Sequence, residues 1–382
     1  MQVLTYFVYL TAISLFIYLL LINLYLYWFK RLKTFQPEDV QPATTFSIII
    51  PARNEAENIE NCLRSILKNN YPKDLFEIIV ADDFSTDATP EIVQLLQSEF
   101  SNIQLISLKN IITKNINSYK KRAIEISIAQ SKYEWIVTTD ADCVIPENWL
   151  NIFNAYIREK KPVFVAAPVM FHCNNSFLSR FQCLDFISLQ GITAASVYAG
   201  KHSMCNGANL AYKKSVFYEV DGFKNADHIA SGDDMLLMHK IKIKHPLLVR
   251  YIFSKEAIVL TEPMPDWKSF FNQRIRWASK ATSYKDKNVL WVLILVYAMN
   301  LFLFLLFFTG FFQPKLFLVW LMFVLIKALL EMPFMYSVSK FFSLQRLMIW
   351  FIIMQPFHIA YTAISGWLGK FGTYKWKGRK VR

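Results

Sequence analysis

Hydrophobic residues are concentrated at the two ends of the chain and alternate with polar segments in between. Apolar residues run almost without interruption from Val3 to Trp28, and about 20 such residues span a bilayer. Three more apolar blocks follow near the C-terminus, at 289–312, 316–336 and 347–368. The pattern predicts an N-terminal membrane anchor (1–29), a linker (30–45), a body (46–285), C-terminal membrane segments (289–368) and a basic tail (369–382).

Short apolar runs within the body alternate with segments of helical spacing. The runs predict strands at 46–50, 76–81, 103–108 and 135–139, and the segments between them predict helices at 56–68, 90–98 and 119–130. Alternation with short connections is typical of an α/β fold with a mostly parallel sheet flanked by helices. All strand C-termini of such a sheet open on one edge.

Polar and mostly acidic turns follow three of the predicted strands. Glu55 follows the first strand, Asp82 and Asp83 follow the second, and Asp140 and Asp142 follow the fourth. Two carboxylates one residue apart at a strand end cannot both face the core, so they emerge at the edge where α/β sheets bind ligands. Paired hard oxygens there suit Mg²⁺ or Mn²⁺. The alternative interpretation of each turn is a hydrogen-bonded helix cap.

The distribution of charged residues predicts how the chain is oriented in the membrane. Lys30, Arg31 and Lys33 follow the first apolar segment, which predicts that the body faces the cytoplasm from an inner or plasma membrane. The net charge of +13 is concentrated beside membrane segments, where membrane lipid attracts it. Because no nucleic-acid-binding motif accompanies this charge, we expect no nucleic-acid partner.

The number of C-terminal crossings stays open at two or three. Three crossings would place the basic tail outside, whereas its lysines and arginines favour the cytoplasm. We favour a cytoplasmic tail, with one block embedded in the membrane or lying on it. Lys327 and Glu331, four residues apart in the middle block, are expected to pair, which lowers the cost of burying both charges.

The five cysteines include no C-x-x-C pair. This spacing predicts thiols in a reducing cytoplasm, with no disulfide framework and no zinc site. The six histidines have no H-x-x-x-H spacing, and we interpret them as packing or surface residues.

Five motifs occur in a fixed order between residues 46 and 280. They are Ile48-Ile49-Ile50-Pro51-Ala52-Arg53-Asn54-Glu55, Asp82-Asp83-x-Ser85-x-Asp87, Asp140-x-Asp142, Gly232-Asp233-Asp234 and Gln273-x-x-Arg276-Trp277. Together they resemble membrane-bound family 2 glycosyltransferases, including cellulose, chitin, hyaluronan and poly-N-acetylglucosamine synthases. The resemblance implies a GT-A fold, with a donor and metal half at 46–145 and an acceptor half at 146–285.

The resemblance also implies a nucleoside-diphosphate sugar as donor, and we favour a UDP-sugar. Glu55 would contact the base or ribose. One of Asp82 and Asp83 would accept the uracil imide N–H, and we favour Asp83. Asp142 would ligate Mg²⁺ or Mn²⁺ directly, and Asp140 would reach the ribose or a metal-bound water.

Two basic residues are expected at the donor diphosphate. Arg276 can neutralise it bidentately. The family often has Gly-Lys before the helix that precedes the acidic tripeptide, but this chain has Tyr119-Lys120-Lys121-Arg122 and lacks the glycine. Lys121 is the candidate for a donor phosphate contact, and a solvated helix start is the alternative.

The catalytic base is assigned by resemblance to Asp234, with Asp233 as the alternative. The family has Glu-Asp at this position, and the chain has Asp in place of Glu. Inverting transfer needs a base to take the acceptor proton, and a carboxylate with a raised pKa suits that task. A helix N-terminus stabilised by acidic residues is the structural alternative.

Acceptor contacts are expected from two further segments. In Cys205-Asn206-Gly207-Ala208-Asn209, Gly207 permits close backbone approach, and Asn206 and Asn209 can bind sugar hydroxyls; the alternative is a tight turn. Gln273, Arg276 and Trp277 share one helix face, and Trp277 would stack on the acceptor sugar. That helix can also rest on the membrane through Phe270, Phe271 and Trp277.

The predicted function is membrane-bound, metal-dependent, inverting transfer of a hexosyl unit from a nucleotide sugar to a polysaccharide or lipid-linked acceptor. A single-sugar lipid glycosyltransferase acting on a ceramide-like or diacylglycerol-like lipid is the alternative within enzymes. A non-catalytic membrane scaffold that binds a nucleotide sugar is the alternative outside them.

Overall fold

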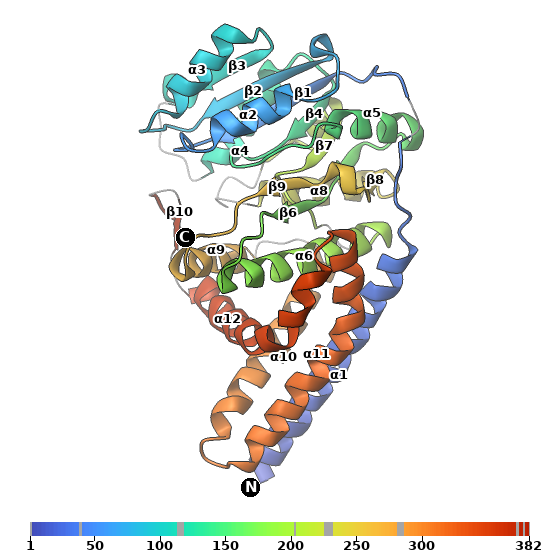
Figure 1. The fold of residues 1–382 in the computed structure, drawn as a ribbon, viewed down its shortest axis with the longest axis vertical. Coiled ribbons are helices and arrows are strands. Elements are labelled where there is room, and N and C mark those ends of the chain that lie inside the picture. The colour runs from blue at the N-terminus through green and yellow to red at the C-terminus, as the bar shows by residue number, and fades with distance from the viewer. Residues whose placement is uncertain are drawn as a thin grey trace.

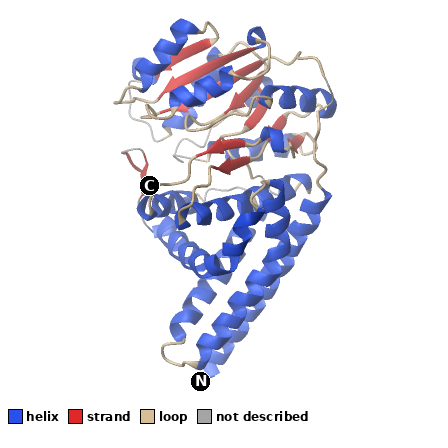
Figure 2. Ribbon diagram, viewed as in Figure 1, coloured by secondary structure: helices blue, strands red, loops and turns tan. Residues whose placement is uncertain are grey.

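The molecule has an α/β body at one end and a tapering bundle of long helices at the other (Figures 1 and 2). This computed structural model describes residues 2–37, 40–112, 118–201, 204–224, 232–280, 286–371, 374–376 and 379–381. The chain starts at the far end of the bundle, and its last described strands lie beside the body (Figure 1).

The body is built on a seven-stranded sheet with the order β3-β2-β1-β4-β7-β5-β8. Its parallel part consists of β1 (Phe46–Ala52), β2 (Phe76–Asp82), β3 (Ile103–Ser107) and β4 (Trp135–Thr138). β7 (Leu210–Lys213) runs antiparallel to both β4 and β5 (Phe164–Ala166), and β8 (Val249–Tyr251) is parallel to β5. Two strands, β6 (Val169–Phe171) and β9 (Val259–Thr261), form a separate small sheet. The mostly parallel sheet that the sequence predicts is confirmed.

Helices cover both faces of this sheet (Figure 2). They are α2 (Ile59–Leu67), α3 (Thr89–Glu99), α4 (Tyr119–Gln130), α5 (Trp149–Lys160), α7 (Lys214–Glu219) and α8 (Asp233–Lys244). Two more, α6 (Phe177–Tyr198) and α9 (Trp267–Ser279), lie between the sheet and the bundle (Figure 1). Short 3₁₀ turns occur at Lys73–Leu75, Leu108–Asn110 and Lys255–Ala257. The predicted apolar stripe of α2 is buried, including Ile59, Cys62, Leu63 and Ile66.

The central strands are buried on both faces. In β1, Ile49 belongs to the hydrophobic cluster on the membrane side, and Phe46, Ile48 and Ile50 belong to the cluster on the opposite face. A strand that is covered on both sides has a nearly continuous apolar sequence. This is why the strand at Phe46–Ile50 is recognisable in the sequence. Only the strand ends can then carry polar side chains to solvent.

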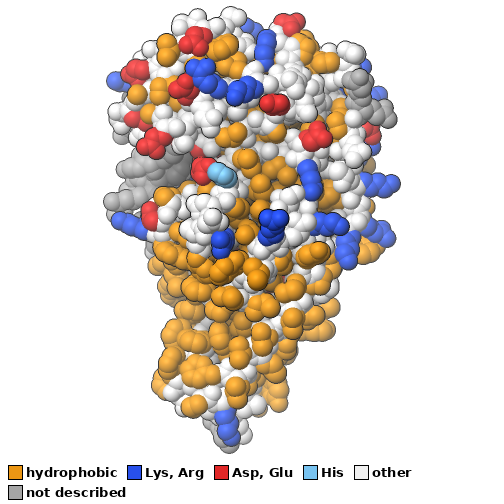
Figure 3. Space-filling model, in the orientation of Figure 1, with side chains coloured by type: hydrophobic (Ala, Val, Ile, Leu, Met, Phe, Trp, Pro, Cys, Tyr) orange, Lys and Arg blue, Asp and Glu red, His pale blue; other side chains and the backbone are white. Residues whose placement is uncertain are grey.

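Four helices are long and apolar enough to cross a membrane. They are α1 (Gln2–Arg31), α10 (Lys287–Thr309), α11 (Lys315–Phe341) and the segment Gln345–Phe371, in which a 3₁₀ turn (Gln345–Trp350) leads into α12 (Phe351–Phe371). On the face shown in Figure 3, apolar side chains cover most of the lower part, and charged side chains lie above it and at its lower tip. An apolar surface of this extent is typical of contact with lipid.

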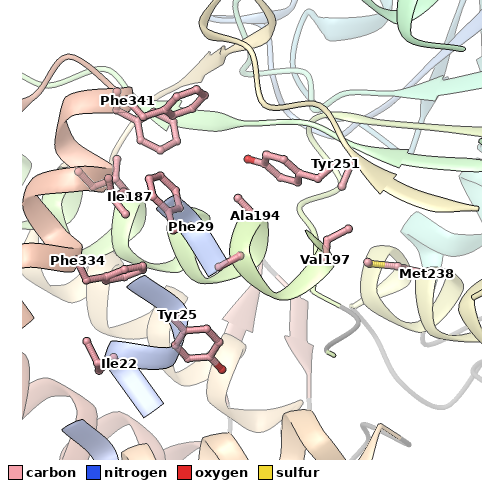
Figure 4. Packing of buried hydrophobic residues seen from close by; sticks show 14 of the residues in the cluster. Ile22, Tyr25, Phe29, Ile187, Ala194, Val197, Met238, Tyr251, Phe334 and Phe341 are labelled. Atoms are coloured by element: carbon pink, nitrogen blue, oxygen red, sulfur yellow. The ribbon is translucent and has the colours of Figure 1, made fainter. Parts of the chain in front are cut away.

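The body and the bundle share one hydrophobic core (Figure 4). Phe29 of α1 packs edge-on against Phe334 of α11, with ring centroids 6.0 Å apart. Phe253 of the body stacks on Phe341 of α11 at 4.0 Å. Ile187 and Ala194 of α6 belong to the same cluster, so α6 is the surface of the body that rests on the membrane helices.

Both ends of α12 contact the body. Near its start, Phe357 lies 5.1 Å from Phe177 of α6, between ring centroids. Near its end, a Cβ on Gly369 would lie 2.7 Å from Cβ of Ala278 in α9, so only glycine permits this close approach. α12 therefore lies along α9, and its C-terminal end returns to the body.

The predicted pairing of Lys327 and Glu331 is confirmed. Nζ of Lys327 lies 2.8 Å from Oε1 of Glu331, and both side chains are buried in the bundle. Gln355 of α12 accepts a hydrogen bond from Lys327 at 2.6 Å and donates one to Glu331 at 2.9 Å. Tyr18 of α1 also donates to Glu331. The pair thus joins three membrane helices.

One expectation about cysteines is wrong. Cys173, just after β6, and Cys183 of α6 form a disulfide, with Cα atoms 6.2 Å apart. C-x-x-C spacing does not reveal this pair, because the two cysteines are ten residues apart and meet only because the short connection before α6 returns that helix beside β6. Cys62 and Cys143 are buried thiols.

Candidate functional site

A cavity of about 1210 Å³ connects the polar edge of the sheet with the membrane helices. Most of the predicted site residues line it. They are Glu55, Asp83, Asp140, Asp142, Asn206, Gly207, Asp233, Asp234, Gln273, Arg276 and Trp277. Asp82, Lys121 and Asn209 do not line it. The structure therefore brings together eleven of the fourteen residues that the sequence proposed.

The turns after β1 and β2 are joined to each other. Asn54 and Phe84 both adopt left-handed backbone conformations, with φ of 50° and 54°. Ser85 Oγ accepts from the Asn54 amide at 3.0 Å, and Asn54 Oδ1 accepts from the Thr86 amide at 2.8 Å. These bonds offset the backbone strain and hold Glu55 and Asp83 at the rim of the cavity.

Asp82 and Asp83 have different environments. Asp83 lines the cavity, and its backbone carbonyl accepts from Arg53 Nη1 at 2.5 Å. Asp82 is buried away from it, and its Oδ1 accepts from the Ser85 amide at 3.3 Å. Burial raises the pKa of Asp82 above its ordinary value. The geometry favours Asp83 as the ligand-facing carboxylate and gives Asp82 a role inside the turn.

Asp87 is part of the same turn and has a structural role. Its Oδ1 accepts from Thr89 Oγ1 at 2.6 Å, and its Oδ2 accepts from the Ala56 amide at 3.1 Å. These hydrogen bonds lower the pKa of Asp87, although burial opposes them. Asp87 fastens α3 to the turn after β1 and does not line the cavity.

Lys120, rather than the expected Lys121, reaches the site. Lys120 Nζ lies 2.7 Å from Asp140 Oδ1, and Lys120 lines the cavity. Lys121 is 1% exposed and packs within the body. Burial by itself would lower the pKa of Lys120. The carboxylates of Asp140 and Asp233 raise it by more than burial lowers it, so the net shift of the pKa is upward. The lysine is therefore a fixed positive charge between two acidic segments.

Asp140 and Asp142 fit a divalent cation that arrives with its substrate. The described residues contain no cluster of three or more His, Cys, Asp or Glu side chains able to hold a metal ion. Mg²⁺ commonly binds one or two carboxylates together with substrate phosphates, and this donor set provides two. Lys120 Nζ lies on one oxygen of Asp140, and Asp142 Oδ1 accepts from Cys143 Sγ at 3.8 Å.

Asp233 and Asp234 begin α8. Gly232 precedes them at φ 81°, a left-handed conformation that glycine adopts without cost. Asp234 Oδ2 accepts from the Gly207 amide at 3.0 Å, which joins the candidate base to one of the predicted acceptor segments. Burial and the neighbouring Asp233 carboxylate raise the pKa of Asp234 above its ordinary value. Both acids line the cavity.

A lysine that the sequence reading overlooked faces these acids. Lys280 follows α9 and lines the cavity. A Cβ on Gly232 would lie 3.3 Å from its Cδ, so the side chain packs over the start of α8. Burial and the charge of Arg276 lower the pKa of Lys280 to about 8. Its charge therefore changes close to physiological pH.

Asn209, which the sequence analysis assigned to the acceptor, is held inside the protein instead. Its side chain is fully buried. Nδ2 donates to the carbonyls of Pro168 and Ala257, each at 2.8 Å, and Oδ1 accepts from Trp149 Nε1 at 2.9 Å. Both Nδ2 hydrogens and one lone pair of Oδ1 are thus used within the protein, and Asn209 does not line the cavity. Asn206 and Gly207, by contrast, line the cavity.

α9 presents Gln273, Arg276 and Trp277 to the cavity, as its spacing predicts. Arg274, between them, is buried and donates from Nη2 to Asp185 Oδ2 of α6 at 2.6 Å. Its guanidinium lies 4.2 Å from the Trp277 ring centroid. Phe270 is fully buried, so it anchors α9 to protein rather than to lipid, contrary to the alternative interpretation.

Five basic residues of the cavity were not proposed as site residues: Arg53, Lys120, Arg274, Lys280 and Lys370. Three of them lie within or next to a recognised motif, and Lys280 lies four residues after Arg276, one helical turn further on the same face. The proximity of these four to the motifs could therefore have identified them as candidate site residues. Which neighbour faces the cavity depends on helix phase, which the sequence alone does not specify.

Carboxylates outnumber cations around the cavity. The described lining residues include nine acidic side chains, Glu55, Asp83, Asp140, Asp142, Asp185, Asp233, Asp234, Glu262 and Glu331. They include six lysines and arginines, Arg53, Lys120, Arg274, Arg276, Lys280 and Lys370. An excess of negative charge disfavours a bare diphosphate and favours one accompanied by a cation.

Curated relatives of this sequence are glycosyltransferases by name. The chain is 29% identical over 189 residues to glycosyltransferase AglE of Haloferax volcanii, covering 50% of this chain and 58% of AglE. It is 26% identical over 258 residues to a poly-beta-1,6-N-acetyl-D-glucosamine synthase of Staphylococcus epidermidis, covering 65% and 57%. The chain thus spans a little over half the length of these relatives.

A solved structure supports the fold. The mannosyltransferase PcManGT from Pyrobaculum calidifontis, in complex with GDP-Man and Mn²⁺, superposes with a TM-score of 0.60 at 18% identity, covering 95% of this chain and 99% of that one. Two sequence families match: "Glycosyl transferase family 2" over residues 47–221, and "Glycosyl transferase family group 2" over residues 135–365. The second match covers more than half of the chain, and with these acidic turns on a GT-A sheet the protein belongs to the family 2 glycosyltransferases.

Proposed function

We propose that this protein transfers a hexosyl unit, with inversion at the anomeric carbon, from a nucleoside-diphosphate sugar to an acceptor hydroxyl at the cytoplasmic face of a membrane. The supporting observation is the convergence of carboxylates from four separate turns on one cavity, with Asp234 at a raised pKa beside the acceptor segment. A UDP-sugar is the favoured donor. The acceptor is a polysaccharide or a lipid-linked molecule.

Donor binding uses the edge of the parallel sheet. Asp83 accepts a hydrogen bond from the base, Glu55 contacts the base or ribose, and Arg276 and Lys280 face the diphosphate. Asp142, with Asp140, would hold Mg²⁺ or Mn²⁺, and such an ion, when bound, stabilises negative charge on the departing diphosphate. The presence of Mn²⁺ with GDP-Man in the structurally similar mannosyltransferase is consistent with this assignment.

The chemistry is a single displacement. Asp234 takes the proton of the acceptor hydroxyl, whose oxygen bonds to the anomeric carbon as the bond to the diphosphate oxygen breaks. The raised pKa makes Asp234 a better proton acceptor than an ordinary aspartate. Trp277 stacks on the acceptor sugar or head group, and Asn206 and Gln273 hydrogen-bond to it. Lys120 holds Asp140 in place between the two acidic segments.

The proposal is tested with purified full-length protein, radiolabelled UDP-glucose, UDP-N-acetylglucosamine and GDP-mannose, and membrane lipids. We expect turnover of one donor, with Asp234→Asn lowering transfer at least about 100-fold while nucleotide binding persists. Equal activity of Asp234→Asn would reject Asp234 as the base. Metal-dependent nucleotide binding without turnover of any donor would favour the non-catalytic scaffold.

A further inference from the structure

The part of the cavity between the membrane helices has one polar wall and one apolar wall. The polar wall is a stripe on α12 formed by Gln355, His358, Thr362 and Ser365, which all line the cavity. Their spacing of three, four and three residues places them on one helix face. The apolar wall comes from α1 and α10, with Leu21, Ile22, Val292, Leu293, Val296 and Leu301.

Several polar atoms at this wall have no hydrogen-bond partner within the described part of the chain. They include Ser365 Oγ, His358 Nδ1 and Arg274 Nε. Ser365 is 3% exposed and Arg274 4%, and both line the cavity. Because buried polar groups in proteins are almost always paired, these atoms point to a polar molecule inside the cavity.

The α12 stripe connects the two charged regions of the cavity. At one end, Gln355 is hydrogen-bonded to Lys327 and Glu331. At the other, α12 packs along α9, where Arg274 lies over the ring of Trp277. A ligand lying along the stripe therefore reaches from the interior of the helix bundle to the residues proposed for sugar transfer.

We propose that this half of the cavity binds the acceptor, and that the acceptor is a membrane lipid with a hydroxyl-bearing head group. The inference rests on the proposed function and specifies its substrate class. The head group lies against the α12 stripe, and the acyl chains lie against α1 and α10. An apolar wall of leucine, isoleucine and valine side chains suits acyl chains better than a sugar chain, because sugar hydroxyls facing that wall would find no partner.

The product of this reaction is a glycolipid. The head-group oxygen forms a bond to the anomeric carbon, the carbon–oxygen bond to the diphosphate breaks, and the hydroxyl proton passes to Asp234. The nucleoside diphosphate leaves on the side of the sheet, and the lipid remains between the helices. Donor and acceptor thus approach the transfer site from opposite ends of one cavity.

The test uses full-length protein in phosphatidylcholine vesicles that contain either diacylglycerol or monoglucosyl-diacylglycerol, with soluble cello-oligosaccharide as the competing acceptor. Donor hydrolysis without acceptor is measured in parallel. We expect label from the sugar in the organic phase. Label in the oligosaccharide alone overturns the inference in favour of a polysaccharide acceptor.

Two substitutions on α10 test whether the apolar wall binds the acyl chains. Leu293→Trp fills the cavity, whereas Leu305, on the same helix, is 42% exposed and lies outside the cavity lining. We expect Leu293→Trp to lower the ratio of lipid transfer to donor hydrolysis at least about tenfold, equivalent to ~1.4 kcal/mol, and Leu305→Trp to change it less than about twofold. An unchanged ratio in Leu293→Trp overturns the inference.

Ser365→Ala examines the polar wall with a smaller change. Loss of one hydrogen bond to the lipid raises its KM by about two- to tenfold. Ser337→Ala on α11 is the control, because Ser337 Oγ already donates to the Pro333 carbonyl at 2.8 Å. If Leu293→Trp fails to fold, this pair decides the question, and equal KM values in the two variants overturn the proposal.

Donor hydrolysis without lipid transfer contradicts this inference alone, whereas a wild-type protein that turns over no donor contradicts the proposed function itself.

Discussion

At the scale of single residues, Asp234 and Lys280 have pKa values shifted in opposite directions. The pKa of Asp234 is raised by burial and by Asp233, and the pKa of Lys280 is lowered to about 8 by burial and by Arg276. A base acts only when deprotonated, so activity falls as the pH drops through the raised pKa of Asp234. A diphosphate-binding cation acts only when protonated, so activity also falls as the pH rises past about 8.

This predicts a bell-shaped pH profile of kcat/KM, which reports the free enzyme. Lys280→Arg keeps its charge at high pH and should move the alkaline limb upward by a unit or more, while the acid limb stays in place. The profiles of wild type and Lys280→Arg are compared with the preferred donor. An unchanged alkaline limb would show that Lys280 is not the group responsible.

Asn206 and Asn209, three residues apart, should respond oppositely to the same substitution. Asn209→Ala leaves Trp149 Nε1 and two buried carbonyls without partners and should cost about 2–5 kcal/mol of stability. Asn206→Ala loses the bond that its Oδ1 accepts from the Ala208 amide at 3.0 Å, so it should lower transfer several-fold at a cost of only about 1 kcal/mol of stability. Thermal unfolding and transfer rates of both variants test this, and a stable, inactive Asn209→Ala would restore its acceptor role.

The sequence predicted side chains well where strand pattern determines their position. Asp140 and Asp142 follow β4 directly, and the buried strand leaves them only the sheet edge. Lys120 and Lys121 could not be separated in this way, because their direction depends on the phase of α4. Asn209 matched a motif, but its burial depends on Trp149 and Pro168, which are distant in sequence. The Cys173–Cys183 bond similarly depends on how α6 returns beside β6.

At the scale of elements, the Lys327–Glu331 pair holds α11 against α1 and α12. Lys327→Met would leave the Glu331 carboxylate buried without its cation, at a cost of about 3–5 kcal/mol. Adding Glu331→Gln removes that charge and should recover part of the loss. A double-mutant cycle on thermal unfolding in detergent measures the coupling, and strictly additive effects would contradict a stabilising pair.

The position of α12 bears on whether the basic tail lies in the cytoplasm. Three C-terminal crossings would place it outside, whereas its charge favours the cytoplasmic side. Because both ends of α12 contact the body, we predict that the basic tail lies on the same side of the membrane as the catalytic body. The turn between α10 and α11 should lie on the opposite side. Alkaline phosphatase fused after residue 371 should be inactive, and the same reporter inserted at 310–314 should be active outside the cytoplasm. An active C-terminal fusion would contradict this arrangement.

At the scale of the whole molecule, two folding patterns meet at one cavity. The parallel sheet brings acidic turns to its edge, and the helices α1, α10 and α12 of the bundle form the walls of the cavity on the membrane side. α6 and α9 lie between them, and the ion pair of Arg274 with Asp185 fastens these two helices together. The donor half can be inferred from sequence because it is built from local strand–turn units. The apolar helices of the membrane half and the Lys327–Glu331 pair were predicted as well, but the packing of these helices on one another was not, since it depends on contacts between segments that are far apart in the chain.

The excess of carboxylates over cations in the cavity leads to a prediction about metal removal. A nucleotide sugar adds further negative charge, so chelation with EDTA should abolish transfer, and Mn²⁺ or Mg²⁺ should restore it. Asp142→Asn removes one carboxylate charge and should raise the metal concentration needed for half-maximal activity at least about tenfold. Asp74→Asn, at an exposed position outside the cavity lining, is the matched control and should behave as wild type. Full activity in metal-free buffer would mean that Lys120, Arg276 and Lys280 neutralise the diphosphate by themselves.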